Sequence, residues 1–284
     1  MSPSFITPLR YPGGKARLGS WLSQVIESNG LYGCHYIEPY AGGAGAAMYL
    51  LINGYVDSIT INDIDKGIYC FWWSIFNRCD DFIDLIKTTP IDIDEWYKQK
   101  IIATNNCMDN PLELGFSTFF MNRTNRSGII KGGVIGGKYQ SGKYKINARY
   151  KKEKLIERIV KLSSYKEKVQ IYNMDAIKFI ENLNSHQKES SLIYMDPPYY
   201  KKGNQLYRNY YSEEEHKEVS TVIQRKASRW IISYDNCAEI RELYKKVSSV
   251  EFSFHYSTHL KRPVGKESLF FSVINIPCAP FMKR

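Results

Sequence analysis

The stretch Asp196-Pro197-Pro198-Tyr199 joins an acidic side chain, two prolines and an aromatic ring, directly after the apolar run Leu192–Met195. The apolar run predicts a buried strand of an α/β sheet, and the prolines end it because proline cannot donate to a sheet ladder. Ligands of open α/β sheets bind outside the carboxyl ends of the strands. A simple turn is the structural alternative, since Asp and Pro are common turn residues. The other predicted strand ends therefore decide whether this is a site.

A glycine-rich turn follows the predicted strand His35–Ile37. Residues 38–45 read Glu-Pro-Tyr-Ala-Gly-Gly-Ala-Gly and lead into a predicted helix at Ala46–Leu51. A strand, a glycine turn and a helix are typical of a nucleotide-type site, although the Walker A ending and the G-x-G-x-x-G spacing are both absent. The next predicted strand, Ser58–Ile61, ends at Asn62-Asp63. There Asp63 is placed to bind ribose hydroxyls, with capping of the following helix as its alternative role.

Two further strand or helix ends carry groups of the same kind. The segment Arg10-Tyr11-Pro12-Gly13-Gly14-Lys15 precedes a predicted helix at residues 16–29, where glycines allow close approach to the backbone and a lysine adds positive charge. Pro-Gly-Gly is also an ordinary turn sequence. The predicted strand Val169–Tyr172 ends before Asp175-Ala176, and a helix is expected from Ile177. Four strand ends thus place polar groups on one predicted edge of a sheet.

The composition predicts a globular protein with a polyanionic partner. The 284 residues are 43% hydrophobic, with a net charge of +10. Residues 121–170 hold 14 Lys/Arg against 3 Asp/Glu, whereas the rest of the chain holds 25 against 26. Such a concentrated excess favours nucleic acid as partner over general solubility. Six irregularly spaced cysteines predict free thiols in a reducing cytosol, and we expect neither a secretory signal nor a membrane span.

The basic excess lies in an insert between two halves of the sheet pattern. Residues 64–120 predict helices with apolar positions three to four apart. Residues 121–149 mix glycine, β-branched and basic residues and predict a mobile hairpin. Arg, Lys and Asn are the side chains that contact phosphates and base edges. The candidates for contact with nucleic acid are Asn122, Arg123, Arg126, Lys138, Lys143 and Arg149.

The remaining chain completes an α/β pattern. A helix is expected from Ser212, strands at Trp230–Ser233, Val250–Tyr256 and Leu269–Ile276, and a short helix near Ala238–Tyr244. Residues 261–266 form a basic linker between the last two strands. The count is about seven strands with crossover helices between most of them, which predicts an α/β fold with one large sheet.

In order and type, these motifs resemble the Dam-like adenine-N6 DNA methyltransferases of the D12 class, α group. The residues that carry the resemblance are Arg10–Lys15, Glu38–Gly45, Asn62-Asp63, Asp175-Ala176 and Asp196–Tyr199, and it extends from Arg10 to about Ile276. The resemblance implies a Rossmann-like seven-stranded mixed sheet, the S-adenosyl-L-methionine (SAM) methyltransferase fold, with an inserted helical and β-hairpin target-recognition domain. It implies a SAM-binding catalytic domain at residues 1–63 and 165–284 and a DNA-binding insert at residues 64–164.

The resemblance also implies roles for single residues. Tyr11 and Lys15 would contact SAM, Asp63 would hold its ribose, and Asp175 with the Ala176 backbone would read its adenine. The backbone around Glu38, Pro39, Ala41, Gly42 and Gly43 would line the methionine part. The Asp196 carboxylate and the Pro197 carbonyl would accept hydrogen bonds from the adenine amino group, with Pro198 completing the turn and Tyr199 stacking on the flipped base. Gly-Gly-Ala-Gly stands where the family often has three glycines, and Ala176 replaces a larger residue.

Several alternatives stay open at the level of sequence. A cytosine-N4 enzyme more often carries Ser at position 196 and a protein-glutamine enzyme Asn, so Asp196 favours adenine. An RNA adenine-N6 methyltransferase and a catalytically silent DNA-binding relative are the other readings. The sequence leaves open the recognition sequence, with GATC as a guess, and whether the enzyme stands alone, belongs to restriction-modification or is phage-borne. We expect a monomer without metal that binds double-stranded DNA in the cytoplasm, associated with the nucleoid.

Overall fold

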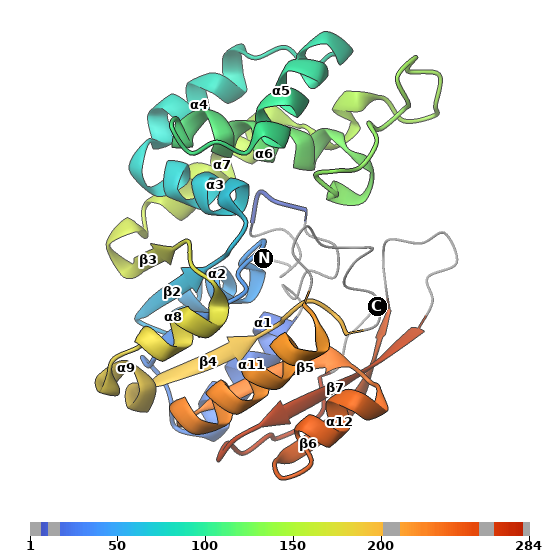
Figure 1. The fold of residues 1–284 in the computed structure, drawn as a ribbon. Coiled ribbons are helices and arrows are strands. Elements are labelled where there is room, and N and C mark those ends of the chain that lie inside the picture. The colour runs from blue at the N-terminus through green and yellow to red at the C-terminus, as the bar shows by residue number, and fades with distance from the viewer. Residues whose placement is uncertain (1–6, 11–17, 201–210, 256–263, 281–284) are drawn as a thin grey trace. The chain divides into compact units, whose positions relative to one another are not determined.

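The computed structural model describes residues 7–10, 18–200, 211–255 and 264–280, and Figure 1 shows its course. The chain divides into two compact units, each made of two segments. The first, the helical unit, comprises Met1–Gly14 and Asp65–Glu167. The second, the sheet unit, comprises Lys15–Ile64 and Lys168–Arg284. The helical unit is thus inserted between β2 and β3 of the sheet, and it also contains the first fourteen residues, which had been expected within the catalytic domain.

The sheet unit holds a seven-stranded mixed sheet in the order β3-β2-β1-β4-β5-β7-β6. The strands β1 to β5 run parallel, and β7 is antiparallel to both of its neighbours. Figure 1 labels β2 to β7. The bounds of the strands are β1 His35–Glu38, β2 Ser58–Asn62, β3 Val169–Tyr172, β4 Ser191–Met195, β5 Trp230–Asp235, β6 Ser248–His255 and β7 Val264–Phe271. The seven-stranded mixed sheet predicted from the sequence is confirmed.

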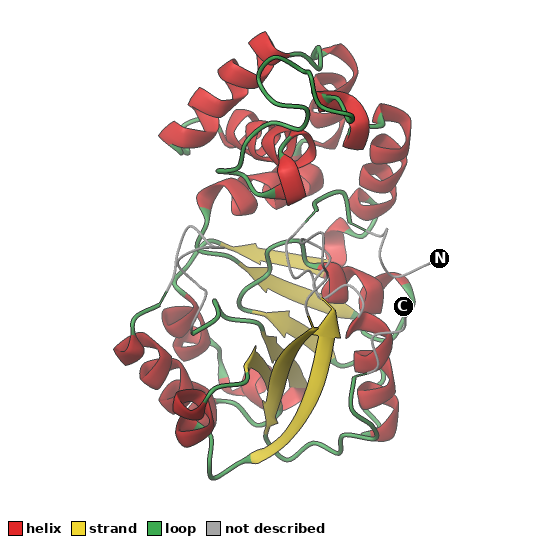
Figure 2. Ribbon diagram, turned by 90° about the vertical axis from the view of Figure 1, so that its right-hand side faces the viewer, coloured by secondary structure: helices red, strands yellow, loops and turns green. Residues whose placement is uncertain are grey.

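Helices cover both faces of this sheet, as Figure 2 shows. On one face α8 (Ala176–Asn182), α11 (Glu213–Lys226) and α12 (Ala238–Leu243) pack on strand residues such as Ile193 and Ile232 in one buried cluster. The described residues of the unit also form α1 (Gly19–Ser28), α2 (Gly45–Ile52) and the short α9 (Ser185–Ser190), of which α1 packs on α2 and α2 on β1 and β2. Strand β4 is buried at all five positions, as expected for a parallel strand covered on both faces.

The last strand begins earlier than the sequence pattern indicates. The apolar run had predicted a strand at Leu269–Ile276 after a basic linker, whereas β7 covers Val264–Phe271. The reason is pairing, because β7 is hydrogen-bonded to β6 along its whole length and to β5 from Glu267 to Phe271. Polar residues of the expected linker therefore enter the sheet, which a hydrophobicity pattern does not detect.

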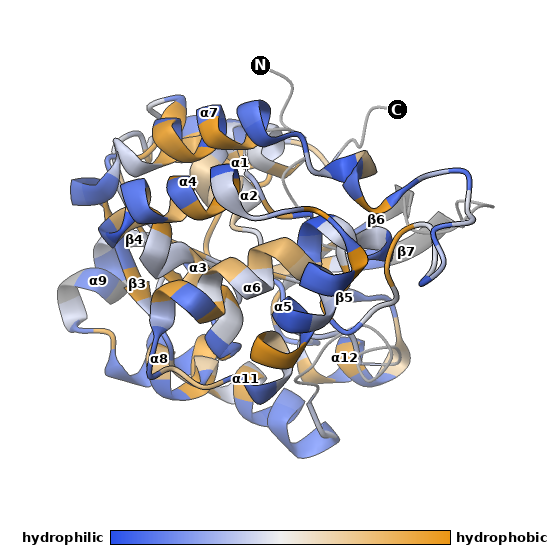
Figure 3. Ribbon diagram, turned by 90° about the horizontal axis from the view of Figure 1, so that it is seen from above, coloured by the Kyte–Doolittle hydropathy of each residue, from blue (hydrophilic) through white to orange (hydrophobic). Residues whose placement is uncertain are grey.

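The helical unit is built around aromatic side chains. Its helices are α3 (Lys66–Asn77), α4 (Cys79–Thr88), α5 (Ile93–Asn105), α6 (Pro111–Thr124) and α7 (Lys152–Ser163). The rings of Phe71, Phe82 and Phe119 pack together with centroids 5.4 to 5.9 Å apart. In Figure 3, α7 alternates hydrophilic and hydrophobic residues, and its buried side chains are Leu155, Ile159 and Leu162. Within the described ranges no helix is long and apolar enough to cross a membrane.

The predicted hairpin at residues 121–149 is wrong in form. Helix α6 continues to Thr124, and two short 3-10 helices follow, η3 (Arg126–Gly128) and η4 (Ile146–Arg149). The β pairing of this segment is one isolated bridge between Asn125 and Val134. Gly128, Gly136 and Gly137 have φ values between +77° and +87°, which interrupt an extended ladder. The side chain of Asn125 also binds the carbonyls of Ile129 and Ile130, so the chain turns where a strand was expected.

Candidate functional site

The candidate site of the sheet unit lies where the strand order reverses. Strands β1 and β4 are neighbours in the sheet, with Ile37 opposite Ile193, but the chain leaves them toward opposite edges. Glu38 ends β1, and Asp196 directly follows β4. In parallel sheets the carboxyl ends of two such strands form a crevice in which ligands bind. The topology therefore brings the glycine turn and the Asp196–Tyr199 motif to the same place.

The glycine turn is held in a tight, buried path. The Ala41 N–H donates to the Asn62 carbonyl at 2.9 Å, and the Ala44 N–H donates to the Ala41 carbonyl. Gly42 and Ala44 have φ values of +47° and +43°. The second is a left-handed conformation that costs an alanine about 1 kcal/mol relative to glycine. Ala44, the residue that departs from the three glycines, thus has a backbone conformation that favours glycine.

Asp63 lies beside this turn. Its Oδ2 accepts a hydrogen bond from the Gly42 N–H at 2.8 Å, and the side chain is only partly buried. The alternative role, capping of the following helix, belongs instead to Asp65, whose Oδ1 accepts from the Gly67 and Ile68 N–H groups. A carboxylate at the tip of β2 that contacts the glycine turn fits the expected contact with ribose hydroxyls.

Asn62 joins three strand ends, a role that the sequence analysis did not identify. Its Nδ2 donates to the carbonyls of Pro39 and Met174 at 3.0 Å, and its Oδ1 accepts from the Met174 N–H at 2.9 Å. The side chain is fully buried. Because these partners follow β1 and β3, one amide fixes the loops that carry the glycine turn and Asp175. In the sequence, the only indication of this role is an asparagine directly before the aspartate that follows the strand.

Asp175 caps a helix at the next strand end. Its Oδ1 accepts from the N–H groups of Ile177 and Lys178 at 3.1 Å, at the start of α8. Ala176 is buried directly after it. Both of these hydrogen bonds use Oδ1, so capping is compatible with a further contact through Oδ2. The predicted residues Tyr11 and Lys15 lie outside the described residues.

Glu38 is a buried carboxyl between the turn and the strand. Its Oε1 accepts from the Tyr36 hydroxyl at 2.9 Å and from the Ala47 N–H at 3.0 Å. Burial first, and nearby Asp196 as a smaller effect, raise the pKa of Glu38 to about 8 against the opposing effect of these hydrogen bonds. A protonated Glu38 therefore connects β1 to the start of α2 at neutral pH.

This shift predicts that folding takes up a proton above pH 4.5. An unfolded Glu titrates near 4.5 and the folded Glu38 near 8, so between these values the folded chain holds a proton that the unfolded chain has released. The free energy of unfolding should then fall as the pH rises, by about 1.4 kcal/mol per unit at most. Glu38→Gln, which keeps the acceptor oxygen, should remove this slope in urea titrations between pH 5.5 and 8. Glu27→Gln on the exposed surface is the control, and equal slopes in wild type and Glu38→Gln would contradict the assignment.

The Asp196–Tyr199 motif is fastened to the neighbouring strands through side chains. The Ser233 hydroxyl donates to Asp196 Oδ1 at 2.8 Å. The Tyr199 hydroxyl donates to Glu267 Oε1 at 2.7 Å. Both partners are fully buried, in β5 and β7. The sequence analysis missed Ser233 and Glu267 because their role depends on pairing between strands far apart in the chain.

In the helical unit, one predicted contact residue has an internal role. Asn122 is buried, its Oδ1 accepts from the Arg10 N–H at 2.7 Å, and its Nδ2 donates to the carbonyls of Arg10 and Gly128 at 2.8 Å. A Cβ atom on Gly128 would lie 2.1 Å from the Arg10 carbonyl oxygen. The segment around Arg10 is therefore tightly docked on the end of α6.

Arginines gather around this docked segment. Arg123 donates through Nη1 to the Pro8 carbonyl at 3.3 Å, while its buried Nε has no hydrogen-bond partner within the described residues. Burial, and then the charges of Arg10 and other arginines, lower the pKa of Arg123 to about 9, so it stays protonated at pH 7. Arg10, Arg123 and Arg149, which we call the arginine cluster, have no acidic partner in the described ranges. Such uncompensated charge fits a polyanion.

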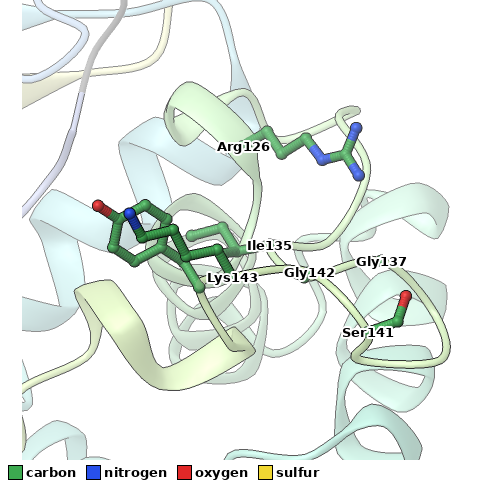
Figure 4. A pocket seen from close by; sticks show the side chains of 8 residues that line it. Arg126, Ile135, Gly137, Ser141, Gly142 and Lys143 are labelled. Carbon is green, nitrogen blue, oxygen red and sulfur yellow. The ribbon is translucent and has the colours of Figure 1, made fainter.

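Two of the other basic candidates, Arg126 and Lys143, line an open pocket of about 410 Å³ in the helical unit. Figure 4 shows Arg126 and Lys143 at this pocket, on different segments of the chain. Gly136 and Gly142 pack closely below it, since a Cβ on Gly142 would lie 3.0 Å from Gly136. The third exposed cation, Lys138, lies over the ring of Tyr97, 5.9 Å from its centroid. The structure thus groups Arg126 and Lys143, with Lys138 on the adjoining loop.

Comparisons with known proteins identify a family. A family model described as D12 class N6 adenine-specific DNA methyltransferase matches residues 11–261. No curated protein matches the chain. Similar solved structures include the SAM dependent methyltransferase from Agrobacterium tumefaciens, with 11% identity, a TM-score of 0.41, and coverage of 92% of this chain and 63% of that one. Another is rRNA methyltransferase aviRa from Streptomyces viridochromogenes, with 8% identity, a TM-score of 0.36, and coverage of 90% and 83%.

Proposed function

This chain belongs to the D12 class of N6 adenine-specific DNA methyltransferases, and on that premise we propose how its residues perform the reaction. The enzyme transfers a methyl group from SAM to the N6 amino group of adenine in DNA. The observation that carries the residue assignment is the meeting of Asp196 and the glycine turn at the β1–β4 crevice. What we propose is the role of each residue in this reaction.

The glycine turn and the neighbouring strand ends form the SAM site. The backbone of Glu38, Pro39, Ala41, Gly42 and Gly43 lines the methionine part, Asp63 binds the ribose hydroxyls, and Asp175 with Ala176 contacts the adenine, together with Tyr11 and Lys15. The fit is supported by Asp63, whose carboxylate lies against the buried turn through the Gly42 N–H. Gly42 and Gly43 leave space for close approach of a ligand to the backbone. SAM supplies the methyl group.

Asp196 and the Pro197 carbonyl then act on the amino nitrogen of the target adenine. This nitrogen is a poor nucleophile, because its lone pair is delocalised into the ring. Two acceptors that bind both amino hydrogens favour a pyramidal nitrogen with its lone pair directed at the methyl group. The Ser233 hydroxyl orients the Asp196 carboxylate, and Pro198 limits the freedom of the turn. Positioning and fixed dipoles are the main contributions that such a direct transfer needs.

The target adenine must leave the duplex to reach this crevice. We propose that it flips out, at a cost of about a few kcal/mol, and stacks on Tyr199. The Tyr199 ring is 3% exposed in the chain alone. Stacking therefore requires the side chains that cover the ring to move aside when the base enters.

The helical unit is the proposed target-recognition part. Its boundaries, residues 64–164 in the proposal, nearly coincide with the inserted segment Asp65–Glu167. The arginine cluster is suited to phosphates, because its charge is partly buried and has no acidic partner among the residues that the structure describes. Arg126, Lys138 and Lys143 are exposed and available to phosphates or base edges. Asn122 positions Arg10 instead of contacting DNA, because its amide is buried and engaged.

Double-stranded DNA is the proposed substrate form, and the proposed place of action is the cytoplasm, on DNA of the nucleoid. We propose that one chain suffices for activity, since the motifs for cofactor, catalysis and DNA all occur in it. Sedimentation of the purified protein with and without a short duplex tests the expected monomer. A dimer in both conditions would contradict it.

Sequencing of methylated adenines in DNA from cells that express this chain tests the proposed function. We expect N6-methyladenine at one short sequence at nearly all its occurrences, which also identifies the recognition sequence. Labelled methyl incorporation into duplex DNA and into RNA of the same sequence compares the two substrates. DNA without N6-methyladenine, or RNA as the better substrate, would refute the proposal for double-stranded DNA.

A further inference from the structure

Three hydrogen bonds connect residues 196–200 to strands β5 and β7. Ser233 of β5 binds Asp196, Glu267 of β7 binds Tyr199, and Asp235 of β5 accepts from the Tyr200 N–H at 2.9 Å. Asp235 and Glu267 are opposite each other in the antiparallel pair β5–β7. The two strands thus present one surface of polar groups beneath the motif.

Glu267 is the unusual member of this set. Its side chain is fully buried, at a register position between Asp235 of β5 and Phe252 of β6. Burying a carboxyl group is costly unless hydrogen bonds satisfy it. Neighbouring Ser268 is also buried, but its hydroxyl has no hydrogen-bond partner in the described residues. Successive strand residues point to opposite faces of a sheet. Glu267 therefore lies on the face of Tyr199 and accepts its hydrogen bond, whereas Ser268 points to the other face.

We propose that Glu267 is a positioning residue for the reaction, which holds the Tyr199 ring at the place where it stacks on the flipped adenine. This inference rests on the proposed role of Tyr199. Glu267 touches neither SAM nor DNA and acts through the Tyr199 hydroxyl. The chemistry that it serves is the approach of the amino nitrogen to the methyl group.

Geometry explains why such a group is needed. A tyrosine side chain turns about two bonds, and its hydroxyl oxygen lies on the axis of the second. The hydrogen bond to a fixed carboxylate therefore restrains rotation about the first bond, which sets where the ring lies. The base enters by displacing whatever covers the ring, so packing alone loses its hold at that moment. The hydrogen bond at the hydroxyl end of the ring stays, because its acceptor Glu267 is fully buried. A small misplacement of reacting atoms has large effects on rate.

The test uses the purified full-length enzyme, SAM and a duplex with one target adenine, in single-turnover experiments. Glu267→Leu removes the acceptor while filling the space, and Tyr199→Phe removes the hydroxyl while keeping the ring. A lost buried hydrogen bond with its partner left in place should slow methyl transfer about fivefold to twentyfold. The double variant should be no slower than the slower single one, since the two changes remove one interaction. Glu267→Gln keeps an acceptor and should stay within about threefold of wild type.

Two controls separate positioning from stability. Ser268→Ala changes the neighbouring buried hydroxyl, and we expect its rate to be that of wild type. For every variant the affinity for SAM, measured by titration calorimetry, should stay within about threefold, because the Asp63 and glycine-turn contacts are distant from β7. With 2-aminopurine at the target position, Glu267→Leu should give brighter fluorescence, since a base that stacks less is quenched less.

The outcomes are distinct. If Glu267→Leu does not fold, Tyr199→Phe decides alone, and an unchanged rate with unchanged 2-aminopurine fluorescence overturns the proposal. A folded Glu267→Leu enzyme with the wild-type rate also overturns it, and so do rate effects of the two single variants that multiply in the double variant. If Tyr199→Ala keeps the wild-type rate, the stacking role itself fails and Glu267 has nothing to position. A slow Tyr199→Ala with a normal Glu267→Leu refutes the role of Glu267 only.

Discussion

Replacing Asp196 with alanine is expected to abolish methyl transfer while SAM and DNA still bind. The role proposed for the carboxylate is to accept from the adenine amino group, and the Ser233 hydroxyl donates to it in the chain alone. Loss of one such preorganised group typically costs about 10²- to 10³-fold in rate. For Asp196 we expect the upper end or beyond, roughly 10³-fold, because the acceptor carries a full charge. Single-turnover methyl transfer to a duplex with one target adenine measures the effect.

Binding measurements make this prediction specific to chemistry. Titration of SAM and of duplex DNA should give dissociation constants for Asp196→Ala within about threefold of wild type, because uniform binding and transition-state stabilisation are separable. Asp84→Ala is a suitable control, since the Asp84 side chain is 71% exposed on α4 and pairs with Lys87. An Asp196→Ala enzyme that methylates adenine at the wild-type rate would falsify the catalytic assignment.

Replacing Arg126, Lys138 and Lys143 together with glutamine is expected to weaken DNA binding roughly 100-fold at moderate salt. These three side chains are exposed and lie at the pocket or on its adjoining loop. Each contact to a phosphate contributes about 0.9 to the slope of log K against log salt concentration. If all three contact phosphates, the slope falls by nearly 3. A smaller change of slope with the same loss of affinity indicates contact to base edges.

The matched control changes the same net charge elsewhere in the helical unit. Lys154, Lys161 and Lys166 are exposed as well, and they lie on or just after α7. Their replacement with glutamine should reduce DNA affinity less than tenfold through the general field, and SAM affinity should change in neither triple variant. Equal loss of DNA affinity in both would show that the basic excess acts as a whole and that the pocket has no special part.

The strand ends of the candidate site were predictable because each depends on local patterns. The apolar runs of β1, β2, β3 and β4 end at polar residues or prolines within one position of the expected place. Parallel strands then bring Glu38, Asp63 and Asp175 to one edge without further information. Ser212 and Glu215 form the capping box of α11, where the acidic first turn had predicted a helix start.

The residues that orient the motif were not predictable, because they depend on tertiary pairing. Glu267 lies in a stretch that reads as the end of a polar linker, and only the alignment of β7 on β5 brings it to Tyr199. For the segment after α6, the local pattern predicted a hairpin that the structure does not contain in the described residues. Its alternating glycines and β-branched residues suggest a hairpin, but the side chain of Asn125 binds nearby carbonyls and turns the backbone.

The docking of Pro8 and Arg10 on the end of α6 limits how this enzyme can be re-engineered. A chimera that exchanges sequence preference would normally replace one contiguous insert, here Asp65–Glu167. If the insert of this chain is moved alone into another enzyme, the amide of Asn122 faces the recipient's N-terminal segment in place of Arg10. The close approach of Gly128 to the Arg10 carbonyl is then lost as well. A transplant should therefore carry residues 1–14 of its donor together with the insert, which requires three junctions with the recipient chain, after residues 14, 64 and 167.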